Sequence, residues 1–123
     1  MAPKRNTVLV VEDDSSMRLL CRVNLELEGF DVLEAPTLDD ARRMLASGTV
    51  DFVVLDVHVG AESGYDLIDT IRSEYPAPIA LITGSAEITQ QDRERVDAVL
   101  PKPFELADLT AAIHRLVAAP AER

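Results

Sequence analysis

The chain has 123 residues, of which 47% are hydrophobic, and its formal net charge is −10. This length fits one domain with one core, and the hydrophobic share excludes a disordered tail. No apolar run approaches the roughly 20 residues that a membrane-spanning helix needs, so we expect no membrane partner. The negative charge disfavours direct binding to nucleic acid, because phosphates would be repelled.

The start of the chain and its cysteine content bear on the compartment. Residues 1–6 are basic but lack the apolar stretch of a secretory signal. Cys21 is the single cysteine, so an internal disulfide cannot form. A reducing cytoplasm is the simplest expectation.

Apolar runs alternate with amphipathic stretches along the chain, which predicts a βα repeat with a parallel sheet. The predicted strands cover residues 7–11, 31–35, 51–56, 79–83 and about 98–100. The predicted helices cover about 15–28, a stretch from 37, a stretch from about 63–64, about 86–95 and about 105–117. Five strands and five helices indicate an α/β fold, a three-layer α/β/α sandwich. We expect a single domain over 1–123, with its core at about 7–117 and with 118–123 as a tail or the start of a linker.

Two of the predicted helices, the first and the fourth, have features that can be predicted in more detail. The first is expected to place near one face the residues Met17, Leu20, Cys21 and Leu27. Gly29 follows it and is suited to end it. The fourth, about 86–95, is mostly polar and is expected to be a weak, exposed helix.

Polar and charged residues stand where the predicted strands end. They are Glu12 and Asp13 after 8–11, Asp56 after 52–55, Thr83 after 79–82, and Lys102 after 99–101. Parallel open sheets bind ligands at the carboxyl ends of their strands. If these runs are strands of one sheet, all these groups meet at one edge.

The acidic residues of this edge suggest a cation site. Three carboxylates within a few ångström repel one another unless a cation lies between them. Mg²⁺ suits such a site, because it takes oxygen ligands and keeps waters that a phosphate can replace. The ordinary alternative is that Glu12, Asp13 and Asp14 are solvated acids before a helix N-terminus, where acids are favoured.

The remaining groups suggest phosphoryl chemistry. Asp56 is the best candidate nucleophile, because a carboxylate can attack a phosphoryl group to form an acyl phosphate. Lys102 offers a point charge to phosphate oxygens, and its bond to Pro103 is a candidate cis peptide. Thr83 offers a hydroxyl donor. Each residue also has an ordinary alternative role: a loop cap, a surface lysine and a strand residue.

Together these pieces resemble the bacterial response-regulator receiver domain, of the chemotaxis-regulator-like kind. The motif pieces are Val10-Val11-Glu12-Asp13-Asp14, Val54-Leu55-Asp56, Thr83-Gly84 and Lys102-Pro103-Phe104. The resemblance extends from about Thr7 to Val117. It implies a flavodoxin-like, doubly wound five-stranded parallel sheet with strand order 2-1-3-4-5 and helices on both faces.

The resemblance also implies roles for the residues of the edge. Asp56 would be the phosphoacceptor and a Mg²⁺ ligand. Asp13 would bind Mg²⁺ directly, Glu12 would act through a water, and His58 would supply its backbone carbonyl to the metal. Thr83 would bind the phosphoryl group.

Lys102 would bind the same phosphoryl group, and the donor would be a phosphohistidine of a sensor histidine kinase or phosphotransfer protein. The output would pass to an unknown partner or to a C-terminal output domain. The domain would be a phosphorylatable switch and not an enzyme, because it catalyses only its own phosphoryl transfer and dephosphorylation.

The chain departs from the family pattern at several places. Val99 stands where the family often has an aromatic residue, and Gly60 where it has proline. The stretch 83–102 is shorter than usual, which predicts a shortened or remodelled fourth helix. His58 and Ser85 stand where family members vary. They either set the lifetime of the phosphorylated state or are simply loop residues.

Three other classes stay open at this point. A haloacid-dehalogenase-like hydrolase usually carries a second aspartate two residues after the nucleophile, where this chain has His58. A flavodoxin-like cofactor binder needs a Ser/Thr/Gly-rich phosphate loop in place of the acidic residues 12–14. A degenerate receiver would act as a phosphorylation-independent protein-interaction module.

Overall fold

The computed structural model describes residues 6–84 and 89–118, with the side chains of 117 and 118 left out. The main strands are β1 (Thr7–Val11), β2 (Asp31–Ala35), β3 (Phe52–Asp56), β6 (Ile79–Gly84) and β7 (Ala98–Lys102). The helices are α1 (Ser15–Leu27), α2 (Leu38–Ala46), α3 (Tyr65–Glu74), α4 (Gln90–Arg95) and α5 (Leu106–Ala118).

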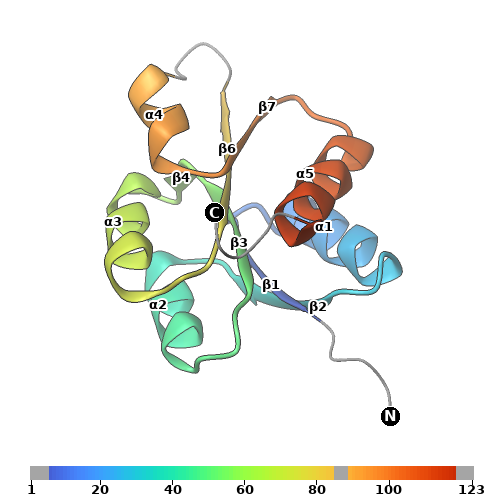
Figure 1. Ribbon diagram of the computed structural model, residues 1–123, viewed down its shortest axis with the longest axis horizontal. Helices are drawn as coiled ribbons and strands as arrows, with labels where there is room; N and C mark the ends of the chain where they lie inside the picture. The colour runs from blue at the N-terminus through green and yellow to red at the C-terminus, as the bar shows by residue number, and fades with distance from the viewer. Residues whose placement is uncertain (1–5, 85–88, 119–123) are drawn as a thin grey trace.

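The five main strands form one parallel sheet in the order β2-β1-β3-β6-β7. Counted among these strands alone, this is the order 2-1-3-4-5, so the predicted fold class is confirmed. Figure 1 shows α1 and α5 on one side of the sheet and α2, α3 and α4 on the other. The molecule is therefore a three-layer α/β/α sandwich, with the strand ends meeting at one edge.

The central strand β3 explains why the sheet is covered on both faces. Its side chains alternate between two clusters, because successive residues of a strand point to opposite faces. Val53 and Leu55 pack with residues of α2 and α3. Val54 packs with residues of α1 and α5. A strand that is buried on both faces needs a continuous apolar run, as residues 52–55 provide.

The buried face of α1 differs from the prediction. Cys21 and Leu25 are fully buried, whereas Leu20 is 51% and Leu27 79% exposed. Apolar residues extend around much of this helix, so spacing alone does not select the face that packs. The predicted end is confirmed, because Gly29 has φ +98° and follows the last helical turn.

A small hairpin between β3 and α3 corrects the predicted count of five strands. The strands β4 (His58–Val59) and β5 (Glu62–Ser63) pair antiparallel. Each has only two residues, which is too short for an alternating apolar pattern. Gly60, at φ +63°, takes the left-handed conformation that the tight turn between them requires.

The fourth helix is short, as predicted. α4 has six residues and begins with a capping box in which Thr89 and Asp92 bond each other's backbone N–H groups. The preceding residues 85–88, which include Ser85, lie outside the described residues, and so do 119–123 of the predicted tail. Within the described ranges, no helix has the length and apolarity to cross a membrane.

Candidate functional site

The strand register brings the predicted site residues to one level. Val11 pairs with Leu55, so the next residues, Glu12 and Asp56, leave adjacent strands side by side. Asp56 in turn pairs with Ile82, the residue before Thr83. The edge strand β7 ends beside β6, where Lys102 pairs with Gly84. Residues far apart in the sequence therefore meet because four parallel strands end together.

The strand alternation also aims these side chains at the same space. Val54 and Leu100 face α1 and α5, and two residues further on Asp56 and Lys102 fall on that face too. Lys102 Nζ donates a hydrogen bond to Asp56 Oδ2 at 3.0 Å. The same Nζ lies 3.7 Å from Glu12 Oε1. One ammonium group thus bridges two carboxylates.

Three carboxylates form a compact acidic cluster. Glu12, Asp13 and Asp56 each offer an oxygen, and these oxygens lie within 4.8 Å of one another. Glu12 and Asp56 are 2% and 4% exposed, and Asp13 is exposed to solvent. The backbone N–H of Asp14 donates to Glu12 Oε2 at 3.1 Å. Glu12 Oε1 has no hydrogen-bond donor among the described residues. A buried acceptor left open beside two further carboxylates fits the oxygen ligands that Mg²⁺ prefers.

The electrostatics of the cluster follow from this crowding. Burial, together with a hydrogen bond and the negative charge from Asp56, raises the pKa of Glu12 from 4.5 to about 7. The Asp14 N–H and the charge of Lys102 oppose this rise.

Lys102 shows the complementary shift. Burial alone would lower the pKa of its ammonium group. The hydrogen bond and charge of Asp56, with the charges of Glu12 and Asp13, outweigh burial and raise the pKa above its ordinary value. Lys102 is therefore cationic at neutral pH. Its peptide bond to Pro103 is cis, as the sequence suggested.

The loop after β3 packs closely around Asp56. The backbone N–H of His58 donates to Asp56 Oδ1 at 3.2 Å. Gly64 lies directly against the Asp56 backbone, because a Cβ on Gly64 would lie 2.2 Å from the Asp56 carbonyl oxygen. The Gly64 N–H also donates to the Val57 carbonyl. Asp56 is consequently held in one orientation.

The structure thus brings together Glu12, Asp13, Asp56 and Lys102. Thr83 is 3% exposed at the end of β6, and its hydroxyl makes a long 3.3 Å hydrogen bond to the Gly84 carbonyl. His58 is exposed beside Asp56. The proposed metal contact of the His58 carbonyl and the phosphoryl contacts of Thr83 and Lys102 stay predictions.

Three contributing residues were missed from sequence. Asp14, expected only as a solvated acid before the helix, caps α1 by accepting from the N–H groups two and three residues further on, and its own N–H donates to the Glu12 carboxylate. Arg18 donates to the Glu12 backbone carbonyl. Gly64 was interpreted only as part of a helix start. An aspartate directly before a helix is a recognisable cap signal, but the other two act through contacts that spacing does not reveal.

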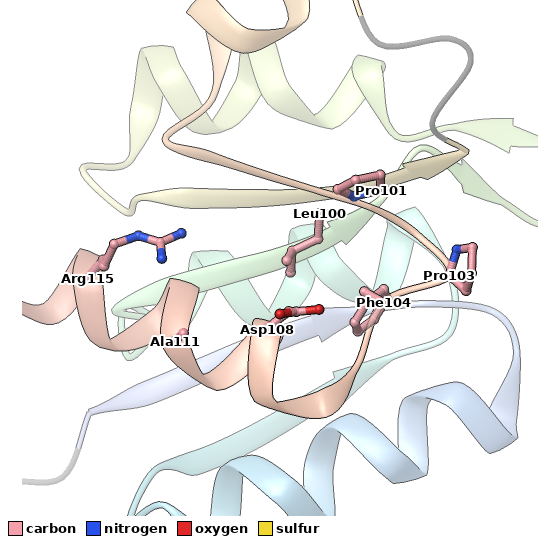
Figure 2. Close-up of a pocket in the computed structure, with 7 residues that line it drawn as sticks. All are labelled: Leu100, Pro101, Pro103, Phe104, Asp108, Ala111 and Arg115. Carbon is pink, nitrogen blue, oxygen red and sulfur yellow. The ribbon is translucent and has the colours of Figure 1, made fainter.

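A separate cavity of about 250 Å³ lies between β7 and α5. Figure 2 shows Leu100, Phe104, Asp108 and Arg115 among the side chains around it. None of the carboxylates of the acidic cluster lines it. The acidic cluster at the strand ends is therefore separate from this cavity.

Comparisons with known proteins agree with this geometry. The profile of the response regulator receiver domain family matches residues 8–114. The transcriptional regulatory protein CpxR of Escherichia coli K12 is 31% identical over 117 residues, which cover 91% of this chain and 49% of CpxR. The chain spans about half the length of the curated relatives it matches first.

Solved structures are similar along most of the chain. The response regulator TrrA of Thermotoga maritima, solved in complex with Mg²⁺ and BeF, is 27% identical with a TM-score of 0.82, covering 90% of this chain and 98% of TrrA. The non-phosphorylated receiver domain of HemR from Leptospira biflexa is 26% identical with a TM-score of 0.83, covering 94% and 97%. The chain belongs to the response regulator receiver domain family.

Proposed function

We propose that this chain is a phosphoacceptor domain in which Asp56 takes a phosphoryl group from a phosphohistidine. The observation that carries the proposal is the placement of Asp56. It is buried at the end of the central strand, 3.0 Å from the Lys102 ammonium and next to two further carboxylates. The donor would be a sensor histidine kinase or a phosphotransfer protein. The proposal keeps the single-domain organisation and the cytoplasmic location expected from sequence.

Glu12, Asp13 and Asp56 are the residues that would hold Mg²⁺. Their oxygens form a hard donor set, and the open Oε1 of Glu12 supports a cation or its bound water there. We assign direct contacts to Asp13, Asp56 and the His58 backbone carbonyl, and a water-mediated contact to Glu12. Bound Mg²⁺ would neutralise charge on the phosphoryl oxygens.

The chain's own residues then perform the transfer. A carboxylate oxygen of Asp56 attacks phosphorus, an O–P bond forms, and the P–N bond to the donor imidazole breaks. The leaving nitrogen keeps the electron pair. Lys102 shifts from Asp56 to a phosphoryl oxygen, and the Thr83 hydroxyl donates to another. The aspartyl phosphate then favours one of two conformations, which changes the surface that an output partner or output domain contacts.

The test uses acetyl phosphate as donor in the presence of Mg²⁺ and intact mass as readout. The parent protein should gain one phosphoryl group, and Asp56→Asn should gain none. Asp39→Asn is the matched control, because the Asp39 side chain is 78% exposed on α2 and outside the acidic cluster. Equal labelling of the parent and Asp56→Asn refutes the assignment. A parent that takes up no phosphoryl group would favour the alternative, a phosphorylation-independent interaction module.

A further inference from the structure

The strongest unassigned feature beside the site is an arginine pair on α1 that meets one glutamate of β2. Arg18 Nε donates to Glu34 Oε1 at 3.2 Å, and Arg22 Nη1 donates to Glu34 Oε2 at 2.7 Å. Glu34 pairs in register with Val10, whose side chain faces α1 and α5. Both oxygens of Glu34 are therefore engaged, and the Arg18 guanidinium is held in one direction.

The other end of the Arg18 guanidinium contacts the loop of residues 12–14, which follows β1. Its Nη1 donates to the backbone carbonyl of Glu12 at 2.8 Å. The backbone N–H of Glu12 donates to the Ala35 carbonyl at 3.1 Å. Glu12 is the point where β1 leaves the sheet, so its carbonyl no longer has a strand partner. Arg18 supplies the missing donor, and the main chain on both sides of the Glu12 side chain is fixed.

The contact between Arg18 and Glu34 is largely shielded from solvent. The Arg18 and Glu34 side chains are 17% and 26% exposed. A charge-assisted hydrogen bond from a preorganised guanidinium is stronger and more directional than a bond to water. Arg22, which is 39% exposed, also bonds Glu34 but, within the described part of the chain, makes no hydrogen bond or ion pair with the loop of residues 12–14. The two arginines thus differ in the one contact that could affect the acidic cluster.

We propose that Arg18, oriented by Glu34, is a positioning residue that holds the carboxylates of Glu12 and Asp13 in the direction needed to bind a divalent cation with Asp56. The inference rests on the proposed function, because it assumes that this cluster binds Mg²⁺. Arg18 acts through the Glu12 peptide and contacts neither the metal nor the phosphoryl group.

An effect of the Arg18 charge and an effect of its positioning role would change the affinity for Mg²⁺ in opposite directions. A cation near the cluster repels Mg²⁺, so if charge alone mattered, removing Arg18 would tighten Mg²⁺ binding. If Arg18 positions the loop, its removal weakens binding despite the lost repulsion. Residues that orient metal ligands typically change affinity by about 10- to 100-fold when mutated.

The experiment titrates the protein with Mg²⁺ alone, at fixed ionic strength, and follows backbone amide shifts by NMR. Arg18→Met should raise the Kd for Mg²⁺ about tenfold. Arg18→Lys keeps the charge but cannot fill both acceptors, so its Kd should lie between those of the parent and Arg18→Met. Arg22→Met is the control and should bind as tightly as the parent or slightly tighter.

A second readout separates positioning from a general defect. Acetyl phosphate labelling of Arg18→Met should recover toward the parent level as Mg²⁺ is raised to saturation. If Arg18→Met does not fold, Arg18→Lys carries the test. Unchanged or tighter binding in the folded Arg18 variants overturns the inference. A parent protein that binds no Mg²⁺ overturns the proposed function instead.

Discussion

The two sides of the acidic edge are held in different ways. On the β1–α1 side, Glu12 is buried, and its backbone N–H and carbonyl are both hydrogen-bonded. The Asp14 N–H donates to the Glu12 carboxylate and so connects it to the start of α1. Beneath this side lies the apolar cluster that contains Cys21 and Leu25. Glu12 is therefore held in place before any ligand binds.

On the opposite side, α4 is attached mainly by polar contacts. Tyr65 of α3 donates its hydroxyl to Asp92 at 3.0 Å, and Arg95 pairs with Asp69 at 2.9 Å while lying over the Tyr65 ring. Arg72 bonds the Arg95 carbonyl at 2.9 Å. Asp92 is the single buried residue that belongs to α4 itself.

The first side is suited to bind a ligand, whereas the attachment of α4 allows this helix to shift. A preformed carboxylate cluster gains affinity because little ordering remains to be done on binding. A helix held by a few hydrogen bonds can shift at small free-energy cost, because exposed polar contacts are readily exchanged for water. We therefore expect substitutions on the first side to change stability or binding strongly and substitutions around α4 to have small, local effects.

The largest expected effect is at Gly64, which packs against the Asp56 backbone at the end of β3. Gly64→Ala should lower the free energy of unfolding by about 3 kcal/mol, because the new Cβ would collide with the Asp56 backbone. Gly84→Ala is the control, since its Cβ would meet nothing within 4 Å, and its effect should stay within about 0.5 kcal/mol. Urea unfolding measures both, and equal stabilities would contradict the close packing.

Next in size is the loss of the Lys102 ammonium. Lys102→Ala should leave the fold intact but weaken Mg²⁺-dependent beryllofluoride binding about thirtyfold, the equivalent of about 2 kcal/mol for a charged hydrogen bond. Arg115→Ala, which removes a cation beside the separate cavity, should bind like the parent. Isothermal titration calorimetry compares the three proteins. An unchanged affinity in Lys102→Ala would remove this residue from the site.

A smaller effect concerns the pH dependence of stability without divalent ions. The folded state keeps the Glu12 proton up to about pH 7, whereas a carboxyl of ordinary pKa loses it near 4.5. Between these values the folded state binds more protons, so the contribution of Glu12 to stability falls as pH rises. Thermal melts of the parent and Glu12→Gln should diverge over this range, and Mg²⁺ should reduce the divergence. Parallel pH profiles would contradict the raised pKa.

The smallest effect is expected at the attachment of α4. The Thr89 N–H, and then the Tyr65 and Thr89 hydroxyls, lower the pKa of Asp92 against the effect of burial. Tyr65→Phe removes one of these donors and should cost about 1 kcal/mol. Hydrogen exchange at residues 90–95 should accelerate while the core exchanges as before. Tyr75→Phe is the matched control, and equal protection of α4 in both variants would show that the hydroxyl contributes nothing.

The sequence predicts the fold best for strands that are buried on both faces of the sheet. The apolar run 52–55 is typical of a strand buried on both faces, and Asp56 stands at its end. The strand order came from resemblance, because local patterns do not say which strands are neighbours. The face of α1 could not be selected, since Leu20 and Leu27 have the same apolar character as the buried Leu25.

The site was predictable in its main residues but not in its supports. The carboxyl ends of parallel strands lie along one edge, so strand-end placement put Glu12, Asp56 and Lys102 on the same edge, and the strand order taken from the resemblance made them neighbours. Arg18 and Glu34 are 16 residues apart, and their contact depends on how α1 lies over β2. Gly64 lies close to Asp56 only because the β4–β5 hairpin returns the chain to the end of β3.

The most direct test of the central claim locates the phosphoryl group itself. The protein is incubated with acetyl phosphate, treated with borohydride to reduce any aspartyl phosphate to homoserine, and sequenced by tandem mass spectrometry. We predict homoserine at position 56 when Mg²⁺ is present and none when it is chelated. Homoserine at another aspartate, or the same yield at position 56 without Mg²⁺, would contradict a metal-dependent phosphoacceptor at the end of β3.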